Sequence, residues 1–88
     1  METNRSGLPQ TFDEEVSGAV RAEMARARLA QATVAEAIHM HPNVFGRKYR
    51  GESAFAPSEL AAVAHLMGLS AADLTSEAER RFFARTAA

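Results

Sequence analysis

Three of the ten basic residues in this chain, Arg47, Lys48 and Arg50, stand almost side by side in the stretch IHMHPNVFGRKYRG, residues 38–51. Their ammonium and guanidinium groups are suited to binding carboxylate or phosphate oxygens, and a guanidinium can do so with two parallel hydrogen bonds. A polyanion is therefore one candidate partner for this segment. The alternative is a charged helix face that is simply solvated.

The distribution of charge along the chain is uneven, although the net charge is only −1. Residues 21–50 contain six basic and two acidic side chains, whereas residues 1–20 and 51–79 have net charges of −3 and −5. A basic middle segment between two acidic ones is a weak sign of a polyanion partner, well short of a strongly basic domain.

No residue pattern indicates catalysis or a metal site. The chain has no cysteine, which excludes disulfides, thiolate ligands and a cysteine nucleophile. His39 and His41 are close in sequence, but no third histidine or carboxylate stands beside them at ligand spacing. There is also no nucleophile motif, phosphate-binding glycine loop or pair of acids with a reason to be buried. We therefore expect no metal, no cofactor and no enzymatic activity.

Length and composition fit one small globular domain, with 88 residues, of which 47% are hydrophobic and 24% charged. No apolar stretch approaches the roughly 20 residues that a membrane-spanning helix needs. The polar start METNRSGLPQ lacks the apolar region of a signal peptide. We expect a cytoplasmic protein.

The elements that must position the basic segment are predicted to be helices only, because alanine recurs throughout and strand-like alternation is absent. Residues 1–10 are predicted to be a flexible arm. Thr11 and Glu14 form a capping-box pattern, and an apolar stripe at intervals of four follows to about Arg28. Leading prolines and trailing glycines mark helices at 42–49 and 57–67. With residues 31–38 and a helix from about residue 70, this predicts an all-α bundle of five helices.

The helices at 31–38 and 42–49 are joined by only three residues. A connection this short forces the helices to cross steeply, which is the geometry of a helix-turn-helix. The crossing requires small or apolar side chains on the inner faces, and the sequence supplies them at Val34, Ala35, Ile38, Met40 and Phe45. We therefore predict a helix-turn-helix at about residues 31–50.

The run QATVAEAIHMHPNVFGRKYRGESAF, residues 31–55, resembles the helix-turn-helix of Cro/repressor proteins, the XRE family, and is similar to lambda-repressor-like DNA-binding domains. The matching features are Gln-x-x-Val-Ala at the start of the first helix, apolar-x-Met across the turn and aromatic-x-Gly at the end of the second helix. The five-helix order and VAHLMGLSAADL, residues 63–74, extend the resemblance to roughly residues 12–75. It implies a lambda-repressor-like DNA-binding domain over residues 11–75.

The resemblance also implies roles for single residues, with the second helix lying in the major groove of double-stranded DNA. The base-contacting positions would be Pro42, Asn43, Val44 and Arg47. The phosphate-contacting positions would be Gln31, His41, Lys48, Arg50 and Ser53. The alternatives are an exposed helix face without a ligand, a polar helix start at Gln31, a helix cap at His41, and inward packing of Val44.

Some residues depart from the family pattern. His39 stands where glycine is usual in a left-handed turn, a conformation that histidine adopts more readily than most residues. Lys48 replaces an apolar residue and is expected to extend its charge into water or toward a phosphate. Met24 and Tyr49 replace an arginine–glutamate pair and are expected to form an apolar contact instead. Gly46 lies inside a helix, where it indicates either a close approach to DNA or a tolerated imperfection.

The segment 76–88 is predicted to be a helical extension, which either continues the fifth helix or restarts at Ser76. Phe82 and Phe83 are adjacent, so on one helix they point in different directions, and only one can easily return to the core. In lambda-like repressors the fifth helix pairs two subunits, which implies a homodimer through these aromatics. The alternative is that both cover the domain's own core.

The sequence thus predicts a sequence-specific double-stranded DNA-binding transcription regulator, specifically a phage-type or prokaryotic repressor of the Cro kind that acts at an operator. The alternative is a protein-interaction module on the same scaffold, such as an antitoxin or an anti-repressor partner. The modest overall charge leaves that alternative open.

Overall fold

The first helix, α1, Phe12–Ala27, begins where the capping-box pattern predicts. The computed structural model describes residues 11–87, and side-chain environments up to residue 85. The Thr11 hydroxyl accepts a hydrogen bond from the Glu14 N–H at 3.1 Å. The Glu14 carboxylate in turn accepts one from the Thr11 N–H at 2.9 Å. Arg28 ends the helix in a left-handed conformation with φ 59°. The predicted arm, residues 1–10, lies outside the described residues.

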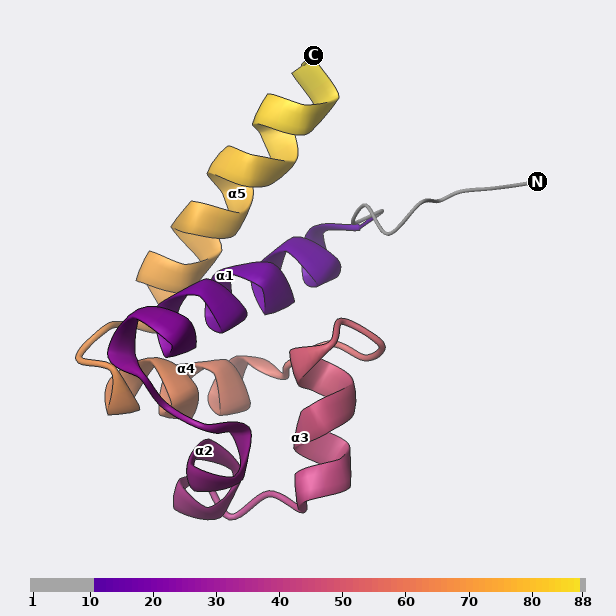
Figure 1. The fold of residues 1–88 in the computed structure, drawn as a ribbon. Helices are drawn as coiled ribbons and strands as arrows, with labels where there is room; N and C mark the ends of the chain where they lie inside the picture. The colour runs from indigo at the N-terminus through magenta and orange to yellow at the C-terminus, as the bar shows by residue number, and fades with distance from the viewer. Residues whose placement is uncertain (1–10, 88) are drawn as a thin grey trace.

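Helices α2, Gln31–Ala37, and α3, Pro42–Tyr49, follow with the predicted short turn between them. His39 has φ 59°, so it occupies the left-handed position expected for it. The Met40 N–H donates to the Ala35 carbonyl at 2.9 Å, which closes the end of α2. Figure 1 shows α2 nearly end-on beside α3 seen from the side, so the two helices cross steeply as predicted.

Helices α4, Pro57–Leu66, and α5, Ala71–Ala87, complete the fold. The Glu59 carboxylate accepts from the Ala56 N–H at 2.8 Å at the start of α4. Ser70 and Asp73 bond each other's backbone N–H groups at the start of α5. α5 is continuous over 17 residues, so the helix does not restart at Ser76.

The core lies between the helices, with α1 packed against α5 and α3, α4 against α5, and α2 against α3. Its buried hydrophobic residues are Val16, Ala19, Val20, Met24, Val34, Ala35, Phe45, Phe55, Leu60, Val63, Ala64, Leu74 and Ala78. Figure 1 shows α2 and α3 at one end of the molecule and the C-terminal half of α5 projecting at the other. Between residues 11 and 87 the chain has five helices and no strand, which confirms the predicted all-α bundle.

Candidate nucleic-acid interface

The outer face of α3 presents polar side chains, while its inner face is fixed in the core. Pro42, Asn43 and Arg47 are exposed, and the last two lie one turn apart on the same face. Phe45 points the other way and is fully buried. Its ring lies 5.9 Å from that of Phe55, at 65° between the ring planes. This buried aromatic fixes the rotation of α3, and therefore determines which side chains face outward.

Val44 is half-buried beside this face.

The N-terminus of α3 is capped by a side chain that the sequence marks for two roles. The Nδ1 of His41 accepts a hydrogen bond from the Asn43 N–H at 3.0 Å, which satisfies one otherwise unpaired donor of the first turn. Pro42 occupies the first helical position, where no N–H is needed. His41 is therefore a helix cap, and its exposed ring also lies at the edge of the outer α3 face.

Gly46 brings Gln31 of α2 and Arg50 together on one side of α3. A Cβ added at Gly46 would lie 3.1 Å from Nη1 of Arg50 and 3.9 Å from Oε1 of Gln31. The guanidinium of Arg50 therefore lies back over the glycine, in space that a side chain would fill. This packing explains a glycine inside the helix. It is a different reason from the two that the sequence suggested, a close approach to DNA and a tolerated imperfection.

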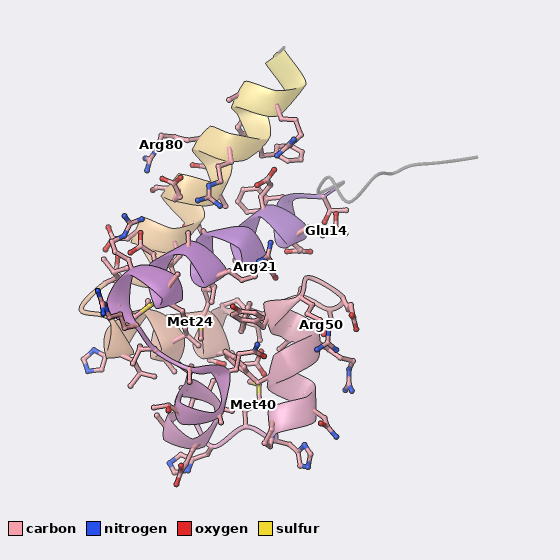
Figure 2. All side chains as sticks on the ribbon, in the orientation of Figure 1. Glu14, Arg21, Met24, Met40, Arg50 and Arg80 are labelled. Carbon is pink, nitrogen blue, oxygen red and sulfur yellow. The ribbon has the colours of Figure 1, made fainter. Side chains whose placement is uncertain are left out.

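Arg50 forms an ion pair with the loop that follows α3. Its Nε and Nη2 donate to the two carboxylate oxygens of Glu52 at 2.8 and 3.3 Å. Both side chains are more than half exposed. The hydrogen bond to Glu52, with the attraction of its charge, raises the pKa of Arg50, so the guanidinium stays positive. Figure 2 shows Arg50 at the C-terminal end of α3.

The ammonium group of Lys48, which was expected to lie in water or near a phosphate, is bonded within the protein. Its ammonium lies 2.9 Å from the carboxylate of Glu59 on α4 and donates to the Ala54 carbonyl at 2.9 Å. Only 15% of its side chain is exposed. Burial raises the pKa of Glu59, but bonds from the Ala56 N–H and from Lys48 together lower it more, so its net pKa is depressed. Lys48 therefore links α3 to α4, and its charge does not lie in water as expected, whereas the predicted phosphate contact stays a prediction.

Two residues of α1 that the sequence interpretation missed hold the C-terminal end of α3. The buried Ser17 hydroxyl donates to the Lys48 carbonyl at 2.7 Å, and Nη1 of Arg21 donates to the Tyr49 carbonyl at 2.7 Å. These carbonyls lie in the last turn of α3, where the i→i−4 donors of the helix have run out, and the Lys48 carbonyl also accepts from the Gly51 N–H at 3.1 Å. Met24 and Tyr49 both join the apolar core, but the polar link between α1 and α3 is made by Arg21. The sequence signal for this contact was a serine, Ser17, within the apolar face of the first helix, where a hydroxyl needs a hydrogen-bond partner.

Ser53 is exposed in the loop between α3 and α4. Gly51 precedes it with φ 86°, as predicted for the glycine that ends α3. The Glu52 N–H donates to the Arg47 carbonyl at 2.8 Å, so the first part of this loop is tied back to the helix. Ser53 thus lies in the loop that follows the basic end of α3.

The two aromatic side chains near the end of α5 take different positions, as predicted. Phe82 is half-buried, and its ring meets that of Phe12 on α1 edge-to-face at 5.9 Å. Phe83 is 59% exposed. Beside them, Nε of Arg85 donates at 3.0 Å to the buried carboxylate of Glu15 on α1. These contacts join the C-terminal half of α5 to α1.

Metal and membrane features were also sought in the described part of the chain. Among residues 11–87, no group of three or more His, Asp or Glu residues is arranged to hold a metal ion. None of the helices in this range is long and apolar enough to cross a membrane.

Comparisons with known proteins place the fold. No family model matches the chain, and no curated protein matches it in sequence. Among solved structures, one of the clp gene regulator ClgR from Corynebacterium glutamicum is similar, with a TM-score of 0.81 and 27% identity over 89% of this chain and 83% of that chain. A second ClgR structure has a TM-score of 0.75 and 27% identity over 83% and 95% of the two chains. The chain has the fold of a helix-turn-helix regulator.

Proposed function

We propose that this chain is a sequence-specific, double-stranded DNA-binding transcription regulator that places α3 in the major groove. The observation that supports this most directly is the exposed pair Asn43 and Arg47, one turn apart on a short helix whose opposite face is fixed by the buried Phe45. The similarity to ClgR, a clp gene regulator, supports the same function.

Base recognition is assigned to the first two turns of α3. An asparagine amide can bond N6 and N7 of adenine, and an arginine can bond O6 and N7 of guanine, each worth about 1–3 kcal/mol of discrimination. Asn43 and Arg47 are proposed to have these roles. Pro42 and the half-buried Val44 lie beside them, where apolar contact with a thymine methyl fits their chemistry.

Phosphate contacts are assigned to the polar groups around this face. Gln31, His41, Arg50 and Ser53 are exposed at the starts of α2 and α3 and beyond the end of α3. Contacts at both ends of a recognition helix fix its register without reading sequence. Lys48 is left out of this set, because its ammonium is bonded to Glu59 and Ala54.

We further propose that the protein is a Cro/repressor-type regulator of the XRE family, a repressor of phage or prokaryotic origin that acts at an operator in the cytoplasm. Support comes from the residues that carry the resemblance. Val34, Ala35 and Phe45 are buried where α2 crosses α3, and His39 takes the left-handed turn position that the family gives to glycine.

The proposed assembly is a homodimer through the C-terminal half of α5. The occupant of this surface is a second copy of the chain, because two recognition helices on a two-fold axis can address half-sites about 34 Å apart. Phe83, 59% exposed, is proposed to lie in that interface, whereas Phe82 packs on Phe12 of its own chain.

A protein-interaction module remains the second candidate, because the same exposed aromatic could bind a different protein. Two variants separate the candidates in a binding assay with a selected duplex. Loss of specific DNA binding by Arg47→Ala, with folding retained, supports the regulator. Retention of full DNA binding by this variant would contradict the proposed base contact, and a requirement for Phe83 in binding another protein would favour the second candidate.

A further inference from the structure

The ion pair between Arg50 and Glu52 lies on the surface that is proposed to meet DNA. Two guanidinium nitrogens of Arg50 face the two carboxylate oxygens of Glu52, at 2.8 and 3.3 Å. An arginine presents the same pair of parallel donors to a phosphate group. Glu52 thus occupies the donors that a DNA phosphate would use.

The backbone holds Glu52 in this place. Gly51 turns the chain at the end of α3 with φ 86°, and the Glu52 N–H donates to the Arg47 carbonyl at 2.8 Å. The carboxylate therefore starts from a fixed point at the end of α3. The hydrogen bond from Arg50, with smaller contributions from the charges of Arg50 and Arg47, lowers the pKa of Glu52. At neutral pH the group is a carboxylate.

The pair contributes little to folding. Both side chains are more than half exposed, 55% for Arg50 and 53% for Glu52, and ion pairs in water are weak because solvent screens them. The ion pair affects DNA affinity more than it affects the free energy of folding. A phosphate that approaches Arg50 must displace the carboxylate and then lie close to a like charge.

We propose that Glu52 is an intramolecular phosphate mimic, which occupies Arg50 in the free protein and lowers the affinity for DNA. This inference rests on the proposed function. Glu52 is a residue that tunes the binding reaction: it competes with every DNA phosphate for one guanidinium. A duplex gains the Arg50 contact only when it is docked closely enough to replace both carboxylate oxygens.

The test measures binding of a fluorescein-labelled duplex of random sequence by fluorescence anisotropy at low salt. The proteins are wild type, Glu52→Gln, Arg50→Ala and the double variant. Glu79→Gln on α5 is the matched control, since it changes the net charge equally at a site away from α3 and the loop that follows it. We expect Glu52→Gln to bind about 3- to 10-fold more tightly than wild type. In the Arg50→Ala background the same substitution should change affinity by less than about 2-fold.

Three results would overturn the proposal, and they are distinguishable. Equal affinity of wild type and Glu52→Gln would show that the carboxylate does not compete. An equal gain with and without Arg50 would show that Glu52 acts only by general repulsion. Failure of wild type to bind any duplex would remove the proposed function, and this inference with it. Thermal unfolding of each variant, expected to match wild type, shows that the differences come from binding.

Discussion

Replacing Gly46 with alanine should separate the stability of α3 from its proposed role on DNA. The added Cβ would lie 3.1 Å from Nη1 of Arg50, the far end of a flexible side chain that can move aside at little cost. Alanine is favoured over glycine inside a helix by about 0.5–1 kcal/mol. We therefore expect the free energy of unfolding to rise by up to about 1 kcal/mol, with an increase in Tm of up to about 8 °C.

DNA binding should change in the opposite direction. The methyl group would push the Arg50 guanidinium off the helix and away from Gln31, on the side where phosphate contacts are proposed. Loss of one such contact corresponds to a fall in affinity of about 5- to 10-fold. The slope of log K against log salt should become smaller by about one.

Gly18→Ala is the matched control for this prediction. Gly18 also lies inside a helix, and its added Cβ would meet the flexible end of Arg81 on α5 at 3.2 Å and, at the ordinary contact distance of 3.6 Å, Nη2 of Arg21 on α1 itself. Urea unfolding and fluorescence anisotropy on a duplex should show similar stability for the two variants and weaker binding for Gly46→Ala alone. Equal binding by both variants, or destabilisation of Gly46→Ala by more than about 1 kcal/mol, would refute the reasoning.

Three further predictions concern the contacts that hold the helices together. Glu59→Gln should destabilise the fold by about 1–2 kcal/mol in chemical unfolding at neutral pH, because the Lys48 ammonium loses its charged partner. The pKa of Glu59 is lower in the folded state than its ordinary value of 4.5. The stabilisation by Glu59 is therefore present above pH 4.5 and is lost as the pH falls through the folded-state pKa. The stability curves of wild type and Glu59→Gln should converge in acid. Ser17→Ala should lower the unfolding free energy by about 1–2 kcal/mol, because it leaves a carbonyl of α3 without this donor; no change would show that water replaces the hydroxyl. Phe82→Ala should lower thermal stability, whereas Phe83→Ala should leave it nearly unchanged and should shift the mass measured by light scattering from dimer to monomer; a monomeric wild type at tens of micromolar would contradict the proposed dimer.

Much of the fold follows from signals that are local in the sequence. The Thr11 and Glu14 capping box, Pro42 at a first helical position and Gly51 with φ 86° all act over a few neighbouring residues. Their types therefore predict the ends of helices. The short connection, predicted as three residues and found as residues 38–41, predicts the crossing of α2 and α3 for the same reason, since its length alone restricts the geometry.

The errors concern contacts between residues far apart in the chain. Lys48 stands between Arg47 and Arg50 in a basic stretch of sequence, and nothing local indicates that Glu59 on α4 is placed to bind it. Ser17 and Arg21 reach the end of α3 across 31 and 28 residues, so their role appears only when α1 is packed against α3. The covering of Gly46 by Arg50 likewise depends on side-chain directions that residue types do not determine.

The central claim is that Asn43 and Arg47 on α3 read DNA bases, and selection of bound duplexes from a random pool tests it most directly. Wild type should enrich one shared, roughly palindromic motif, and Asn43→Ala/Arg47→Ala should fail to enrich it while unfolding as wild type does. Arg80→Ala, which removes a positive charge from α5, should enrich the same motif as wild type. No enrichment by wild type at low salt, or the same motif selected by the double variant, would contradict the claim.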